Sequence, residues 1–344
     1  MAMSFIEEIM AQNKRRTWLL VLLFPLVFAA LGYVCLFGAL RSSAEPGVLS
    51  EAEAIHYESL EIIPSDTRLA FDRTNAAALH FLPFFWLLAM IWVLLSWFVG
   101  DHILLKGSGA VEIYREDQPE IFALVENLCA VSGLPVPRVF IIDDDSLNAF
   151  ATGRDPEHAS IALTKGIVLK LDRQELAGVI AHELSHVLNR DTRLMLITIA
   201  GISFFTLLSE ICFRSARCSS RNRKNSKNNG QSLLLLLGCL FAIYGYVLAP
   251  LIRLAISRTR EYYADATAAY MTRNPRALAE ALYKISHDSR VEELDKRASM
   301  SAMCIANPLE KNNFFAYLSG VFATHPPIEK RINALLDMDK QMTC

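Results

Sequence analysis

Four long apolar segments constrain this chain more than any other feature of its sequence. Two of them, residues 18–40 and 76–99, exceed the roughly 18 residues that a helix needs to cross a bilayer. A third, 194–213, is interrupted by polar residues and predicts either a span or a helix at the membrane surface, whereas 233–256 predicts a span. The sequence therefore predicts a mainly α-helical integral membrane protein, with the lipid bilayer as a partner.

Composition agrees with this prediction. Only 20% of the residues are charged and 53% are hydrophobic, whereas about a quarter of a soluble domain is charged. The net charge of −2 gives no electrostatic case for nucleic acid as a partner. The seven cysteines are scattered and form no Cys-x-x-Cys pair, which favours reduced thiols facing the cytosol over a disulfide framework.

Charges at the ends of the apolar segments predict the orientation. Lys14, Arg15 and Arg16 precede the first span, and an acidic loop, 41–77, follows it. The positive-inside rule places the N-terminus in the cytoplasm and the loop outside, as in a multi-pass protein of the plasma (inner) membrane. The basic segment 214–227 leaves two alternatives open, because it lies outside if both later apolar segments span and inside if they form a half-inserted hairpin.

Residues 101–190 predict a mixed α and β unit between the membrane segments. The stretches "VEIY", "RVFIID" and "SIALT" are strand-like, and a helix between the first two ends at Gly133. Asp172 and Glu175 form an N-terminal capping pair for the next helix, and Pro275 begins a later one. Four parts are expected: an N-terminal transmembrane hairpin (1–100), a first part of a domain outside the membrane (101–190), a second membrane hairpin (191–256) and the second part of that domain (257–344).

The helix that follows Asp172 contains the string "HELSH". His182 and His186 are four residues apart and therefore lie on nearly the same helix face, where two imidazoles can bind one zinc ion. Glu183 lies on the adjoining face and is placed to take the proton of a metal-bound water. Apolar neighbours indicate that this helix is buried, where histidines without partners would be costly. The pattern predicts a metal centre.

A catalytic zinc site needs a third protein ligand and one open position. The sequence offers two candidates, Glu210 in the third apolar segment and Glu261 after the fourth. Glu261 has Asp265 one turn further on, which can orient a ligand from behind. Asp191, taken as part of the same helix as His186, points away from the ion. Spacing alone does not decide between the third ligand and an ordinary surface acid.

Several motifs together resemble one family. "HELSH" is followed by two apolar segments, by "REYYADATA" and by "THPP", while "NAFATG" at 148–153 and "IALTKGIV" at 161–168 precede it. This order resembles the HtpX-type membrane zinc metalloproteases, whose relatives include the eukaryotic prenyl-protein protease. The resemblance covers most of the chain. It implies a zincin-like α+β metalloprotease domain in addition to the transmembrane helices.

The resemblance also implies roles for particular residues. One Zn²⁺ per chain would be bound by His182, His186 and Glu261, with Glu183 as the catalytic base and Asp265 supporting the ligands. His325 would steady the oxyanion, although a His before two prolines can equally begin a helix. The resemblance further implies substrate-binding roles, and these fall on Asn148, Ala149 and Arg331.

The sequence thus predicts a zinc endopeptidase that cleaves peptides or membrane proteins in membrane-protein quality control, with its active site facing the cytoplasm. Two alternatives belong to other classes. A transporter could use buried ionisable residues to relay protons, but His182 and Glu183 lie outside the apolar segments. A metal-binding scaffold or chaperone without proteolysis would not need Glu183.

Overall fold

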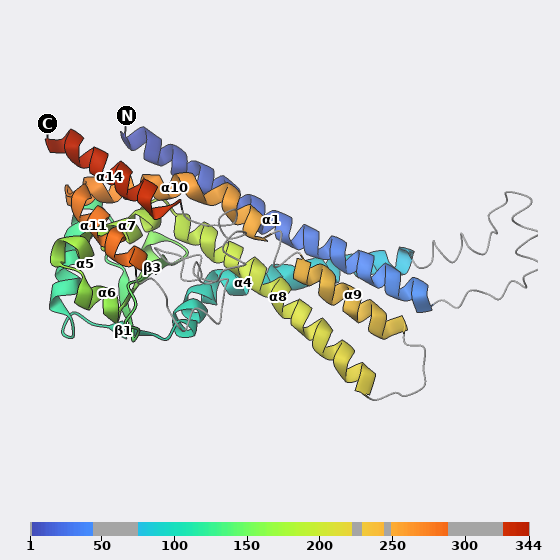
Figure 1. The fold of residues 1–344 in the computed structure, drawn as a ribbon. Helices are drawn as coiled ribbons and strands as arrows, with labels where there is room; N and C mark the ends of the chain where they lie inside the picture. The colour runs from blue at the N-terminus through green and yellow to red at the C-terminus, as the bar shows by residue number, and fades with distance from the viewer. Residues whose placement is uncertain (1, 44–74, 222–228, 244–248, 288–325, 344) are drawn as a thin grey trace, which may run out of the picture. The chain divides into compact units, whose positions relative to one another are not determined.

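The computed structural model describes residues 2–43, 75–221, 229–243, 249–287 and 326–343 (Figure 1). The chain divides into two compact units. The first consists of Met1–Leu19, Leu95–Ile202 and Val247–Cys344, and the second of Leu20–Leu94 and Ser203–Tyr246. All the strands that the structure describes lie in the first unit, which we call the α/β unit. The second is helical, and we call it the helical unit.

Within the described residues, three helical segments are long and apolar enough to cross a membrane. They are Thr17–Val34 in α1 (Ala2–Ser43), Asn75–Gly107, which includes α4 (Leu82–Gly107), and Asp191–Arg217 in α8 (Asp191–Arg221). The third of these is the apolar segment whose polar residues made its span uncertain from the sequence. The fourth apolar segment falls on α9 (Asn229–Ile243) and α10 (Ala249–Thr272), and its residues 244–248 lie outside the described part of the chain.

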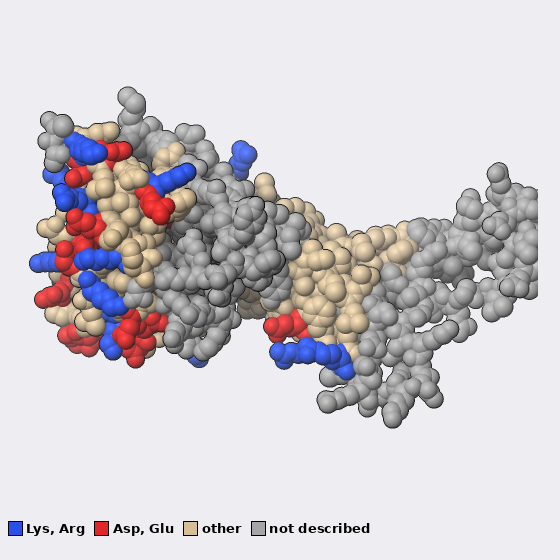
Figure 2. Space-filling view, viewed as in Figure 1, with Lys and Arg blue, Asp and Glu red and all other residues tan. Residues whose placement is uncertain are grey.

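The surfaces of these helices are apolar. Leu22, Phe84 and Phe98 are 63%, 58% and 62% exposed, which is typical of a face that meets lipid or a partner rather than water. Figure 2 shows acidic and basic side chains interspersed over the α/β unit and a large uncharged area over the membrane helices. The described part of the chain is therefore mostly helical, with the surface of a membrane protein.

Aromatic rings fill the interior of the helical unit. Phe28 from α1 and Phe204 from α8 meet edge to face with their ring centroids 4.9 Å apart. Phe205, Phe241 and Ala89 complete a buried cluster with these two rings. Edge-to-face packing gives aromatic pairs an attraction beyond area burial, so the helices of this unit are held by specific contacts.

A four-stranded mixed sheet organises the α/β unit. Its strand order is β1 (Ala110–Ile113), β2 (Arg138–Ile142), β4 (Ser160–Thr164) and β3 (Ala149–Thr152). β2 and β4 are parallel, and the two outer strands are antiparallel to their neighbours. The three strand-like stretches of the sequence correspond to β1, β2 and β4. β3, a strand at the edge of the sheet, falls on "NAFATG", which the residue pattern alone did not predict as a strand.

Helices pack around α7 (Arg173–Leu188), which contains the "HELSH" string. α5 (Pro119–Ser132), α10 and α11 (Pro275–His287) contact α7, and α14 (Ile328–Thr343) packs against α11. The expected cap at Gly133 is present, with a left-handed φ of 70°. The 3₁₀ helix η1 (Pro156–His158) lies between β3 and β4, and α6 (Lys165–Lys170) lies between β4 and α7.

Candidate metal centre

Helix α7 begins at the predicted capping box and buries its polar string. The side chain of Asp172 accepts hydrogen bonds from the backbone N–H groups of Gln174 and Glu175, and the Glu175 carboxylate accepts one from the N–H of Asp172. Two turns further on, His182 is fully buried and Glu183 is 2% exposed. The local sequence thus fixes the start of the helix, and its packing places these polar groups in the interior.

Donor atoms from three residues converge at this point of the interior. His182 Nε2 and His186 Nε2 are 3.2 Å apart. Oε2 of Glu261, from α10, lies 3.6 Å from His182 Nε2, and its Oε1 lies 3.7 Å from His186 Nε2. Among the described residues, these three form a group of His, Cys, Asp and Glu side chains that could hold a metal ion.

The size of this triangle fits zinc. Ligands bound tetrahedrally at about 2.0 to 2.2 Å are separated from one another by about 3.3 to 3.6 Å. The three separations lie close to this range, and two imidazoles with one carboxylate are a donor set of catalytic rather than structural zinc sites. The residues present therefore fit the metal that the sequence predicts.

His182 is held from behind by an ion pair. Asp265 Oδ1 lies 3.0 Å from His182 Nδ1, and the guanidinium of Arg331 donates to both oxygens of Asp265, at 2.7 and 2.8 Å. Arg331 Nη1 also lies 3.5 Å from Oε2 of Glu261. Arg331 is fully buried and Asp265 is 1% exposed, so α14 delivers its arginine directly into the metal centre.

The pKa values of this group follow from those contacts. Burial alone would raise the pKa of Asp265, but the charge and hydrogen bonds of Arg331 outweigh it and lower the pKa to about 2. Burial alone would lower the pKa of His182, but the nearby carboxylates of Asp265 and Glu261 outweigh it and raise the pKa to about 9. Without a metal, His182 is therefore in its charged imidazolium form at neutral pH, with a proton on each ring nitrogen.

His186 has a carboxylate behind it as well. Asp191 Oδ2 lies 3.1 Å from His186 Nδ1, and Arg260 Nη1 lies 3.0 Å from Asp191 Oδ1. The expectation that Asp191 belongs to the same helix as His186 was wrong, because α7 ends at Leu188 and α8 begins at Asp191. The sequence does contain a signal for this break between helices. Asn189 favours the end of a helix, and Asp191 is an acid suited to the first turn of a new one.

Glu183 lies between the metal centre and the edge of the sheet. Burial raises its pKa, and the backbone of Ala151 in β3 makes a hydrogen bond to it. The two expected substrate residues begin this strand region. Asn148 and Ala149 are each 1% exposed, and the Ala149 N–H donates to the side-chain oxygen of Asn148 at 3.0 Å.

The remaining residues named from the sequence are Glu210, His325 and Arg331. Glu210 lies in the helical unit, where it pairs with Arg214 at 3.2 Å. His325 lies outside the described residues. Arg331 faces carboxylates on both sides, which favours a role in positioning the centre over the expected contact with substrate.

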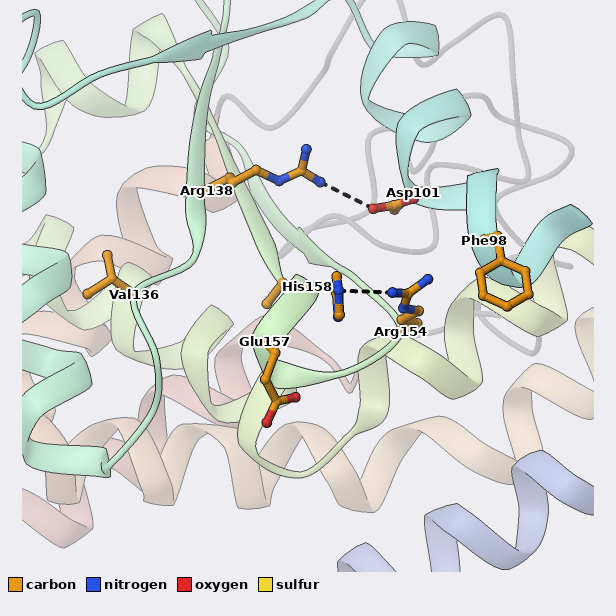
Figure 3. A pocket seen from close by; sticks show the side chains of 8 residues that line it. Phe98, Asp101, Val136, Arg138, Arg154, Glu157 and His158 are labelled. Atoms are coloured by element: carbon orange, nitrogen blue, oxygen red, sulfur yellow. Dashed lines mark hydrogen bonds and ion pairs between the residues drawn. The ribbon is translucent and has the colours of Figure 1, made fainter.

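A cavity of about 470 Å³ lies elsewhere in the α/β unit and contains none of the predicted site residues (Figure 3). Arg138 faces Asp101 across it at 3.2 Å, and Arg154 lies beside His158. Arg154 also pairs with Asp155. Because each arginine has an acidic partner, the lining is electrically balanced and offers no free cationic site.

Comparisons with known proteins agree with this geometry. Residues 115–339 match Peptidase family M48. A protein named protease HtpX homolog from Bacteroides fragilis (strain YCH46) is 40% identical over 332 residues, which cover 96% of this chain and 98% of the relative. The protease HtpX homolog of Ligilactobacillus salivarius (strain UCC118) is 42% identical over 241 residues, covering 70% and 80%.

A solved structure, the crystal structure of S. mikatae Ste24p, is similar with a TM-score of 0.45 and 21% sequence identity. The match covers 77% of this chain and 60% of that chain.

Proposed function

This chain belongs to peptidase family M48, a family of metalloproteases, and on that premise we propose that it is a zinc-dependent endopeptidase of the membrane. The observation that carries the proposal is the convergence of His182, His186 and Glu261, in which the two imidazole Nε2 atoms are 3.2 Å apart and each lies 3.6 to 3.7 Å from one of the two Glu261 carboxylate oxygens. A carboxylate beside that triangle, Glu183, adds the acid–base group that hydrolysis needs.

We assign one zinc ion per chain to the three donors. When bound, the ion would activate a water molecule and polarise the carbonyl of the scissile peptide bond. Asp265 fixes the ring of His182 by binding Nδ1, which leaves Nε2 with its lone pair toward the other donors. Arg331 keeps the Asp265 carboxylate ionised and in place through two hydrogen bonds.

Glu183 acts as the proton carrier in this proposal. Its carboxylate takes a proton from the attacking water and returns it to the nitrogen of the leaving amine. Burial raises the pKa of Glu183 above its ordinary value, which moves the group toward the neutral range where a base can also serve as an acid. His325 keeps its expected role of steadying the oxyanion as a proposal that stems from family resemblance.

The edge of the sheet would bind the substrate. Within the described residues, β3 has β4 as its only strand neighbour, so its other side is the edge at which an extended peptide can add by main-chain hydrogen bonds. Asn148 and Ala149 stand at the start of this strand, and the backbone of Ala151 bonds to Glu183. A peptide aligned with β3 would therefore pass beside the proposed base.

A cluster of three residues supports the proposed orientation. Trp18 and Trp97 have ring centroids 6.5 Å apart, and the guanidinium of Arg193 lies 4.3 Å from the Trp97 ring and 5.9 Å from the Trp18 ring. Trp and Arg favour the interface between membrane and water. The cluster joins the start of the first span, the end of the second and the start of the third, as expected if all three meet one membrane face.

We infer from this cluster that the N-terminus and the catalytic residues lie on the same side of the membrane. The basic residues before Trp18 place that side in the cytoplasm, so residues 1–100 form a transmembrane hairpin with an external loop. The substrates would be peptides and membrane proteins, and the role would be quality control in the plasma (inner) membrane. Residues 191–256 would be the second membrane hairpin, between the two parts of the catalytic domain, residues 101–190 and 257–344.

A cleavage assay tests the proposal directly. The full chain, purified in detergent, should cleave an unfolded protein such as casein when zinc is supplied and should stop when zinc is chelated. Restoring zinc should restore cleavage. Stoichiometric zinc binding without any cleavage would contradict the proposed enzyme and favour a metal-binding scaffold.

A further inference from the structure

Asp191 and Arg260 form a second support for the metal centre, separate from Asp265 and Arg331. We propose that Asp191 is a positioning residue that orients His186, and that Arg260 holds Asp191 for this task. The inference rests on the metal centre proposed above. It assigns a role to an acid that the "HELSH" pattern does not include.

The contacts around His186 carry the proposal. Asp191 Oδ2 lies 3.1 Å from Nδ1, while Nε2 of the same ring faces His182 and Glu261. An acceptor at Nδ1 keeps the proton on that nitrogen and leaves Nε2 as the metal donor. The carboxylate of Asp191 is buried, with its side chain 6% exposed, so water competes little for it.

Three features hold this carboxylate in place. Arg260 Nη1 lies 3.0 Å from Oδ1, the oxygen that does not face His186. Asp191 is also the first residue of α8, where the positive end of the helix dipole favours an anion. Arg260 directly precedes Glu261 in α10, so the pair ties His186 to the segment that brings the third donor.

The backbone between the two helices turns Asp191 toward His186. On a continuous helix, a residue five positions further on would lie about 140° away around the axis. Instead, Asn189 ends α7 and Arg190 adopts a left-handed conformation with φ of 59°, its N–H bonding to the Val187 carbonyl at 3.1 Å. That conformation is unfavourable for any residue other than glycine, and strained residues of this kind gather at functional sites.

The same turn connects the metal centre to the membrane part of the chain. Asp191 begins the candidate span Asp191–Arg217, so the residue that orients His186 is also the first residue of a membrane helix. Each of the two histidines thus has its own carboxylate, Asp265 for His182 and Asp191 for His186. We infer that both are needed for full zinc affinity.

The test compares Asp191→Asn with a buried acid of α7 that touches no metal donor. Glu175 is 2% exposed and pairs with Lys284 at 2.7 Å, so Glu175→Gln removes a buried charge without touching the centre. Zinc affinity would be measured by competition with a chelator, and cobalt would replace zinc to report ligand geometry by its visible spectrum. Cleavage kinetics would give kcat and KM separately.

We expect Asp191→Asn to weaken zinc binding about 10- to 100-fold, which is typical for loss of a group that orients a ligand. The cobalt spectrum should change, and kcat should fall with KM unaltered. Asp191→Glu should recover part of the affinity because it restores the charge. Glu175→Gln should lower thermal stability yet keep the zinc affinity and cobalt spectrum of the unaltered protein.

Two results would overturn the proposal. If the unaltered chain binds zinc and Asp191→Asn matches it in affinity, cobalt spectrum and kcat, Asp191 has no positioning role while the metal centre stands. If the unaltered chain binds no zinc at all, both the metal centre and this inference fail.

Discussion

The imidazole Nε2 of His182 lies 3.6 Å from the Oε2 of Glu261, although two apolar segments of the chain separate these residues. The contact joins α7 to α10, and the packing of those helices against each other fixes it. A pairing of this kind turns two local patterns into one candidate metal centre. The role of each residue in this centre can be tested by a single substitution followed by measurement of zinc binding and cleavage.

Glu183→Gln should keep zinc and lose cleavage. Glutamine is close in size to glutamate but cannot take a proton, and loss of a general base costs about 10²- to 10⁴-fold in rate. The measurement is kcat on an unfolded protein substrate, together with zinc content and thermal stability of the same preparation. Turnover equal to that of the unaltered enzyme in a folded, zinc-loaded Glu183→Gln sample would rule out the proposed base.

Arg331→Met should destabilise the protein and weaken the metal centre. It would remove the arginine from its buried ion pair with Asp265, and breaking a buried pair in this way typically costs about 3 to 5 kcal/mol. Zinc affinity should fall together with thermal stability. Lys340→Met on the same helix is the control, since Lys340 pairs with Asp337 at the surface and such pairs contribute about 0 to 1 kcal/mol. Equal effects of the two changes would count against the role of Arg331.

Zinc binding should release about one proton at pH 7. The pKa of His182 is raised to about 9 in the metal-free protein, so the ring is protonated at pH 7 and must lose that proton to bind a metal. Zinc affinity should accordingly rise with pH up to about 9. Calorimetry in buffers of different ionisation enthalpy counts the protons.

Asp265→Asn provides the comparison for that experiment. It removes the acceptor that raises the pKa of His182, so fewer protons should be released at pH 7. Binding without proton release in the unaltered protein would show that His182 is neutral before the metal arrives.

The loop 41–77 should face the outside and residues 101–190 the cytoplasm. Glu116 is exposed in the α/β unit, so Glu116→Cys and Ser59→Cys, each in a background without other reactive thiols, can be treated with a membrane-impermeant reagent. In intact cells residue 59 should react and residue 116 should not. Reaction of residue 116 alone would reverse the orientation.

Local patterns in the sequence predict much of this structure, because their causes are local. The spacing of His182 and His186 follows from helix geometry, and the cap at Asp172 from hydrogen bonds within one turn. The segment 194–213 meets the length and hydropathy of a span despite its polar residues. The residue pattern did not predict the edge strand β3, because the strand is short and its extended form depends on pairing with β4.

Residues that act across the chain were harder to predict. Spacing alone left Glu210 and Glu261 as alternatives, because the choice depends on how α10 packs against α7. Asp191 was assigned the wrong direction because the left-handed turn at Arg190 is not apparent from a pattern that suits a continuous helix. Arg331 was expected at the substrate, whereas its contact with Asp265 depends on the placement of α14.

The zinc content of Glu261→Ala, compared with that of Glu210→Gln, tests the proposed metal centre most directly. Loss of one of three protein donors should leave Glu261→Ala with little zinc and no cleavage. Glu210→Gln should retain one zinc per chain and near-normal activity, because Glu210 pairs with Arg214 in the helical unit. Elemental analysis of both purified proteins decides the matter. Stoichiometric zinc in Glu261→Ala, with zinc lost from Glu210→Gln, would contradict the assignment of the third ligand and with it the proposed centre.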